Sequence, residues 1–289
     1  MLHCWLRNHV IAATCVASLL ATSQPANAWS AASGWFQAQG ARVRLIAASI
    51  ADGSGADRVF AGVQLQLDKS WKTYWRTPGD AGGIPPELDF EKSINLQAGP
   101  VLYPAPHGST DANGTSIVYS DEVVFPVQIT PEDLAAPSLL KANVVFGACL
   151  DVCVPVETAL ALELVDQQGA DASISEKLMK YLRRVPHKVL MGAATTPSVQ
   201  SIKARLTGPV PEIIIEARYA SAGAQSGDLF VEIEDGTNIS IPAKISLWRD
   251  NLDETAAAIR LAAAADSDGK IVAIRSASKA FLIVADAAL

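Results

Sequence analysis

The stretch KANVVFGACLDVCVPVETALALEL, residues 141–164, holds two cysteines with three residues between them. Leucines from Leu160 to Leu164 recur at every second position, the spacing of a β-strand with one buried face. In a straight strand, two residues four positions apart lie about 13 Å apart, whereas a disulfide needs Cα atoms about 4.4–6.8 Å apart. If Cys149 and Cys153 are bonded, the chain must turn between them, which places the pair at or near a bend between two strands.

The same alternation recurs through the first half of the chain. Apolar and polar positions alternate in RVRLIAAS (42–49), VFAGVQLQLD (59–68) and EVVFPVQI (122–129). Short alternating segments bounded by Gly, Pro, Asp and Ser are typical of an antiparallel β-sandwich. Pro126 cannot donate a backbone hydrogen bond, which predicts an edge strand or a bulge at that position.

Residues 167–190 break the alternation and predict a linker with one helix. Ser173 and Glu176 fit a capping box, the apolar side chains that follow share one helical face, and Pro186 ends the helix. That apolar face predicts a contact with a core or between domains.

Seven short alternating runs follow the linker. The sequence therefore predicts an all-β protein of two β-sandwich domains, residues 35–166 and 195–289, joined by the helical linker. Residues 1–28 combine a basic start, an apolar run shorter than the roughly 20 residues of a membrane helix, and the small triplet Ala-Asn-Ala. These features predict a signal peptide that is cleaved on export.

Composition narrows the function classes. The chain of 289 residues has a net charge of −7, which argues against a nucleic-acid surface because phosphate binding needs clustered Lys and Arg. No apolar run after the signal is long enough to span a membrane. Signal cleavage removes Cys4 and Cys15, and export places Cys149 and Cys153 in an oxidising compartment where a disulfide persists.

Three interpretations of the cysteine pair remain open from the residues alone. As a staple, a loop of about five residues contributes only roughly 2 kcal/mol, which a sandwich of this size hardly needs. As a metal clip, two thiolates suit a soft ion such as Cu(I), but His107 and His187 have no partner at ligand spacing. As a redox pair, a short and accessible loop favours thiol exchange.

Four segments carry a resemblance to a known family. LDKSWKTYWRTPGDAGGIPPELDF (67–90), LYPAP (102–106), TSIVYSDEVVFPVQI (115–129) and GACLDVCVPVETALALEL (147–164) occur in this order. Together they resemble the amino-terminal exported domain of the DsbD and ScsB thiol:disulfide reductases, and the ScsB-like branch more closely. The resemblance covers about residues 35–166 and implies an immunoglobulin-like fold, a fold that it also implies for the second half.

The resemblance implies that Cys149 and Cys153 are an exchanging pair in a periplasmic protein-disulfide oxidoreductase that needs no cofactor. The implied partners are a separate membrane thiol reductase and a thioredoxin-like client protein. DsbD relatives cover their pair with a cap loop, and residues 107–115 correspond to it here without an aromatic residue. Two alternatives stay open: a non-catalytic binding module with a structural disulfide, and a copper-binding module.

Further site residues are predicted around the pair. Trp71, Tyr74 and Trp75 are either core residues or an aromatic wall that shields the cysteines and offers a docking face. Asp151, between the cysteines, either disfavours a neighbouring thiolate by its charge or serves only as a turn residue.

Overall fold

The computed structural model describes eleven parts of the chain: 30–51, 57–79, 81–112, 114–164, 171–187, 189–194, 198–205, 212–219, 230, 244–249 and 255–262. The predicted signal peptide, residues 1–28, lies outside them. Much of the predicted second sandwich, residues 195–289, does so too.

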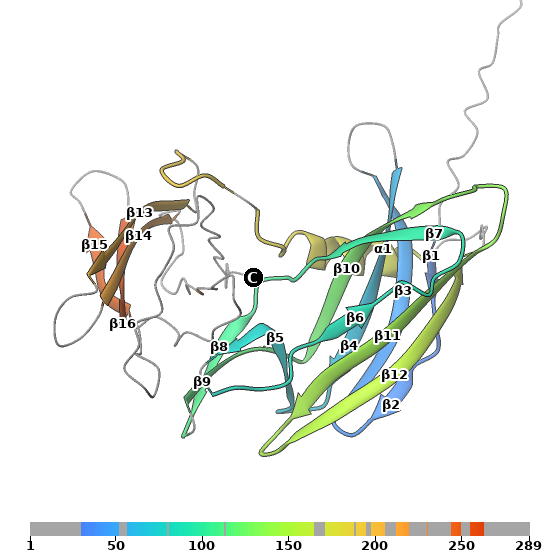
Figure 1. Cartoon of the computed structure of the whole chain (residues 1–289), viewed down its shortest axis with the longest axis horizontal. Coiled ribbons are helices and arrows are strands. Elements are labelled where there is room, and N and C mark those ends of the chain that lie inside the picture. Colours follow the sequence, from blue (N-terminus) through green and yellow to red (C-terminus); the bar gives the residue numbers. More distant parts are fainter. Residues whose placement is uncertain are drawn as a thin grey trace, which may run out of the picture.

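The first half is a sandwich of two antiparallel sheets (Figure 1). Sheet A has the order β1-β3-β4-β10-β7, with β2 beside β3. Its strands are β1 (Ser30–Ala32), β2 (Phe36–Ala38), β3 (Ala41–Ala51), β4 (Asp57–Leu67), β7 (Leu96–Val101) and β10 (Glu122–Pro131). Sheet B has the order β12-β11-β5-β9-β8, with β6 beside β11. Its strands are β5 (Lys72–Gly79), β6 (Glu87–Asp89), β8 (His107–Asp111), β9 (Gly114–Ser120), β11 (Ser138–Cys149) and β12 (Cys153–Leu164).

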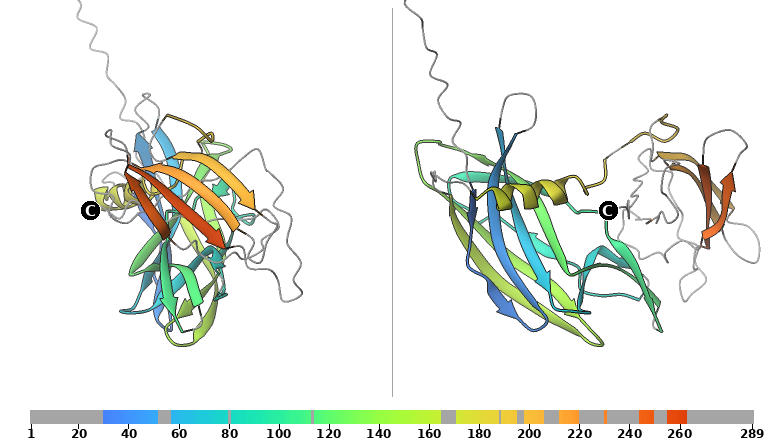
Figure 2. Two further views of the ribbon diagram at one scale, coloured as in Figure 1. Left: turned by 90° about the vertical axis from the view of Figure 1, so that its left-hand side faces the viewer. Right: turned by 180° about the vertical axis from the view of Figure 1, so that it is seen from behind.

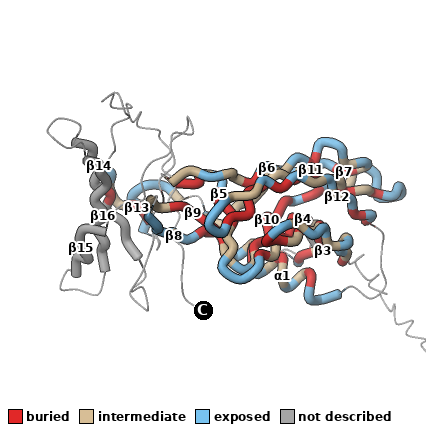
Figure 3. The backbone as a smooth tube through the Cα atoms, turned by 90° about the horizontal axis from the view of Figure 1, so that it is seen from below, coloured by how far each residue is buried: buried red, intermediate tan, exposed pale blue. Residues whose placement is uncertain are grey.

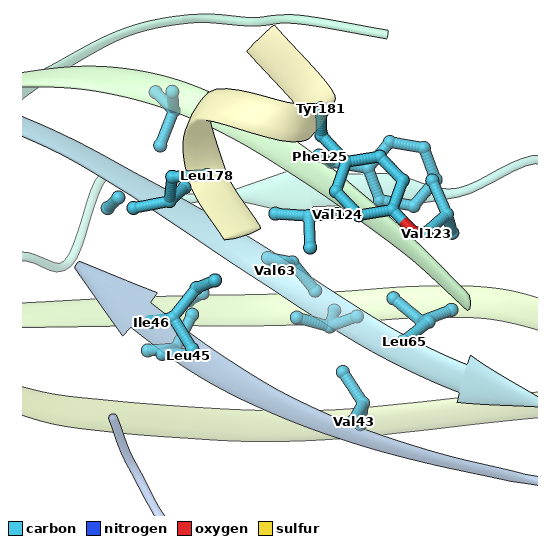
Figure 4. Close-up of a cluster of buried hydrophobic side chains, with 14 of the residues drawn as sticks. Val43, Leu45, Ile46, Val63, Leu65, Val123, Val124, Phe125, Leu178 and Tyr181 are labelled. Atoms are coloured by element: carbon cyan, nitrogen blue, oxygen red, sulfur yellow. The ribbon is translucent and has the colours of Figure 1, made fainter. Parts of the chain in front are cut away.

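The core lies between the two sheets, as the alternation predicts. Strand residues that face inward are fully buried, and Figure 3 shows buried and exposed positions alternating along the strands. Figure 4 shows part of this cluster, which includes Val43, Leu45, Val63, Leu65 and Phe125. The predicted all-β sandwich is therefore confirmed.

Pro126 lies in β10, which is an inner strand between β4 and β7. The edge-strand alternative for this residue is therefore wrong. The register between β10 and β7 shifts between Val127 and Ile129, directly after the proline, so an irregularity does accompany it.

Helix α1 (Ala172–Leu182) lies across the outer face of sheet A (Figure 2). Its apolar face, with Leu178 fully buried, belongs to the same core cluster as the sandwich, which confirms the predicted core contact. A Cβ on Gly62 would lie 3.1 Å from Leu178, so the glycine lets the helix approach the sheet. The predicted Ser173–Glu176 capping box is wrong: Asp171 is the N-cap, and its carboxylate accepts from the Ser173 amide at 2.9 Å.

A polar network joins α1 to the sheet at Glu122. The Lys177 ammonium lies 2.7 Å from Glu122 Oε2, the Tyr181 hydroxyl donates to the Glu122 carbonyl at 2.8 Å, and the Gln64 amide donates to Oε2 at 2.8 Å. Burial alone would raise the pKa of Glu122, but the hydrogen bonds from these neighbours outweigh it, and the pKa lies below its ordinary value.

The described part of the second half is a four-stranded antiparallel sheet of order β13-β14-β16-β15. Its strands are β13 (Ser198–Arg205), β14 (Glu212–Tyr219), β15 (Lys244–Arg249) and β16 (Thr255–Ala262). Phe230 reaches the first half, where its ring lies 6.1 Å from that of Trp75 and it is 2% exposed. Of the helical segments that the structure describes, none is long and apolar enough to cross a membrane.

Candidate redox site

The two cysteines close a hairpin. Strands β11 and β12 pair without a register shift from Ser138 and Leu164 to Cys149 and Cys153, and a disulfide joins the last pair across a Cα–Cα distance of 4.0 Å. The loop between them is only three residues long, and its Leu150 amide donates to the carbonyl of the last loop residue at 3.3 Å. The turn predicted between the cysteines is confirmed.

The two sulfurs differ in access. Cys149 is 1% exposed and packs with Tyr74 and Val118 in a small apolar cluster of its own. Cys153 is only partly buried at the edge of that cluster. Because β12 is the outermost of the described strands of sheet B and Cys153 is the less buried of the two, an incoming thiol reaches Cys153 more readily than Cys149.

The phenol of Tyr74 contacts the more accessible sulfur. Its oxygen lies 3.1 Å from Cys153 Sγ. A disulfide sulfur carries no proton, so the hydroxyl is the donor in this state. The sheet sets this geometry, since β5 lies between β11 and β9, with Lys72 opposite Cys149 and Tyr74 opposite Val118.

The segment after β5 covers the buried side of the site. Gly83 has φ +151°, and a Cβ there would lie 2.4 Å from the Tyr74 ring, so only glycine fits against it. The next residue, Ile84, accepts a hydrogen bond from the Gly147 amide at 3.1 Å. A Cβ on Gly147 would meet Ile84 at 3.0 Å and Cys149 Sγ at 3.6 Å. Two glycines thus allow this segment to pack closely beside the disulfide.

The resemblance predicts a cap loop at residues 107–115, and the described residues of this range belong mainly to the hairpin of β8 and β9. Asp111 near its tip lies 3.4 Å from the Lys72 ammonium, and Lys72 is the cross-strand neighbour of Cys149. Thr110 and Thr115 share a hydrogen bond of 3.0 Å across the hairpin. The described residues of this stretch therefore pair with one another and are linked through Lys72 to the strand beside the disulfide.

The two tryptophans belong to the main core cluster and not to the small cluster that holds the cysteines. Trp71 packs on Gly40, where a Cβ would lie 2.0 Å from the indole. Trp75 is 0% exposed and faces the sandwich core beside Phe230. Asp151 is exposed at the centre of the loop. Of the three aromatic candidates, Tyr74 is the one that the structure brings to the cysteines.

Comparison with known families agrees with this site. Residues 46–164 match the family described as "Thiol:disulfide interchange protein DsbD, N-terminal". These residues form a DsbD/ScsB-like N-terminal domain. The matched segment holds both cysteines and all of sheet B, but it begins within β3, leaves out β1 and β2 of sheet A, and ends before helix α1.

A solved structure has a similar fold. The chain is similar to the N-terminal periplasmic domain of ScsB from Proteus mirabilis, with 21% sequence identity and a TM-score of 0.53. The match covers 81% of this chain and 86% of that chain. No curated protein matches the sequence significantly. The immunoglobulin-like sandwich expected for the DsbD/ScsB-like domain is thereby supported by both fold and family.

Sequence reasoning missed Lys72, Gly83 and Ile84 as neighbours of the disulfide in the DsbD/ScsB-like domain. Lys72 could have been found from its spacing, because residues two positions apart in a strand share a face. Lys72 therefore lies on the same face as Tyr74 and the cysteines. No local pattern marks Gly83 and Ile84, since their place depends on how the segment after β5 folds back. Among the described residues, no three His, Cys, Asp or Glu side chains gather in a way that could hold a metal ion.

Proposed function

We propose that the chain is an exported thiol:disulfide interchange protein that passes two electrons through Cys149 and Cys153. The donor is a separate membrane thiol reductase and the recipient a thioredoxin-like client in the periplasm, which makes the chain a protein-disulfide oxidoreductase. The observation that carries the proposal is the partly exposed Cys153 sulfur, in a disulfide at a hairpin tip, with the Tyr74 hydroxyl 3.1 Å away.

Electron uptake begins at Cys153. A donor thiolate attacks Cys153 Sγ, the internal S–S bond breaks, and Cys149 leaves as a thiolate that takes up a proton. The donor's second thiolate then attacks its own sulfur in the mixed disulfide and releases Cys153 as a thiolate. The donor ends as a disulfide, and the chain holds the two electrons as a dithiol.

Electron delivery reverses these steps. The Cys153 thiolate attacks the client's disulfide and expels one client thiolate, which takes up a proton. Cys149 then loses its proton and attacks Cys153 Sγ, which restores the internal disulfide and releases the reduced client. The Tyr74 hydroxyl donates to the sulfur of Cys153 and stabilises the charge whenever that sulfur is a thiolate.

Two measurements test the proposal on the full chain. Equilibration with glutathione, followed by mass spectrometry, should give a reduction potential above about −300 mV, the range below which structural disulfides lie. Cys149→Ser should trap a mixed disulfide through Cys153, while Cys153→Ser should trap far less because Cys149 is 1% exposed.

A pair that stays oxidised below about −300 mV would contradict the proposal. So would trapping by neither variant, a result that fits a binding module with a structural bond.

A further inference from the structure

The loop between the cysteines exposes two large apolar side chains. Leu150 is 44% exposed and Val152 is 75% exposed, whereas the other large apolar side chains of the hairpin are buried or half-buried. The hydrogen bond from the Leu150 amide to the Val152 carbonyl holds both residues in a tight turn. Figure 1 shows this turn at the free end of the long β11–β12 hairpin, at one end of the sandwich.

A protein that exchanges with Cys153 cannot avoid this loop. A mixed disulfide brings the partner's cysteine Cα within about 4.4–6.8 Å of the Cys153 Cα. The Cα of Val152, the preceding residue, lies only about 3.8 Å from that of Cys153. No described strand pairs with the free edge of β12, and Cys153 is itself only partly buried, so a partner can reach it from that edge. The other side is closed by Tyr74 and by the segment that contains Ile84.

We infer that Leu150 and Val152 form an apolar docking tip for a protein thiol whose surface around its reactive cysteine is itself apolar. The inference rests on the proposed function and names the kind of partner that it requires. The carboxylate of Asp151 stands exposed between the two apolar side chains. The rim of the partner's surface is therefore neutral or basic, because an acidic rim would face Asp151 on a chain of net charge −7.

The test compares a protein thiol with a small one on the full-length oxidised chain. The probes are reduced thioredoxin, whose reactive cysteine can contact the tip, and reduced glutathione, which is too small to bury it. Stopped-flow measurement gives the second-order rate of disulfide reduction for the parent and for Leu150→Ser and Val152→Ser. Leu134→Ser is the control, because Leu134 is 85% exposed and lies on a different loop.

Both tip variants should react with thioredoxin at least about tenfold more slowly than the parent, since each loses apolar area that the complex buries. Their rates with glutathione should stay within about twofold of the parent, because the polar substitutions leave both sulfurs and Tyr74 in place. Leu134→Ser should match the parent with both probes.

Tip variants that react with thioredoxin as fast as the parent would overturn the inference, as would a parent that reacts no faster with thioredoxin than with glutathione. An equal slowing with both probes would also overturn it, because the loop would then set sulfur reactivity instead of docking. The oligomeric state of the parent, measured by sedimentation, is the remaining check. If the parent is a dimer and Val152→Ser dissociates it, a second copy of the chain binds the tip and the inference is overturned. A parent inert to both thiols would instead refute the proposed function itself.

Discussion

Replacing Tyr74 with Phe removes one oxygen from the site and keeps the ring. That oxygen lies 3.1 Å from Cys153 Sγ, and the ring, 5% exposed, retains its contact with Gly83. A hydrogen bond to a charged group contributes about 1.5–3 kcal/mol, and each 1.36 kcal/mol is tenfold in a protonation equilibrium. The Cys153 thiolate fraction should therefore fall by about tenfold or more in the variant.

The rate of reaction falls less than the thiolate fraction. The thiolate that does form in the variant is more basic and therefore a better nucleophile, with a Brønsted coefficient of about 0.4–0.5. This gain offsets roughly half of the loss in thiolate fraction on a logarithmic scale, so the logarithm of the rate falls by the other half. We expect Tyr74→Phe to slow alkylation of Cys153 by iodoacetamide about three- to tenfold at neutral pH. The assay uses Cys149→Ser protein, in which Cys153 stays reduced, and follows the alkylated mass with time.

Tyr119→Phe is the matched control. The Tyr119 hydroxyl is buried and donates to the Pro104 carbonyl at 2.7 Å, away from the sulfurs. Its loss should cost about 1 kcal/mol of stability and leave the alkylation rate unchanged. If Tyr74→Phe alkylates as fast as the parent across the pH range, the hydroxyl does not stabilise the thiolate and the reasoning is refuted.

Three further predictions concern the support of the site and the fold. Gly83→Ala should slow the same alkylation at least as much as Tyr74→Phe, because the added Cβ displaces the Tyr74 ring; an unchanged rate would contradict the close packing. Phe230→Ala should lower the free energy of unfolding in urea by about 3 kcal/mol or more, and a change below about 1 kcal/mol would show that the contact with Trp75 is not formed in solution. Glu122 has a pKa below its ordinary value of 4.5, so its ionised form contributes stability above that pH, and the contribution is lost as the pH falls through the lowered pKa. Glu122→Gln should therefore lose less stability than the parent between about pH 5 and pH 3, as chemical unfolding at each pH would measure, and identical slopes would exclude this role.

The sequence predicts the sheets well where one face of a strand is apolar. The segments 42–49, 59–68 and 122–129 all became long strands, because alternation at a period of two reports burial directly. Residues 107–115 carry no such alternation, since β8 is polar and mostly exposed on both faces, so the hairpin of β8 and β9 could not be predicted from the pattern. The helix was predicted, but its cap was not, because Asp171 and Ser173 are both good N-caps and the local sequence does not decide between them.

For the site, too, the sequence predicts some residues and not others. Cys149 and Cys153 could be singled out from their spacing and from their lying outside the predicted signal peptide, which contains the other two cysteines. The sequence does not show which face of β5 each aromatic residue occupies. In the structure, Tyr74 shares a face with the disulfide, and Trp75, the next residue, points into the core. The contact between Trp75 and Phe230 joins segments far apart in the chain, so no local pattern encodes it.

Helix α1 also determines how this module can be moved between proteins. A fragment cut at Leu164, where the family match ends, retains both cysteines and all the strands of the sandwich. It would nevertheless present Ile46 and Val124, now fully buried, as part of a bare apolar face, and such faces promote aggregation. A functional graft into another protein must therefore carry the chain through the end of the helix.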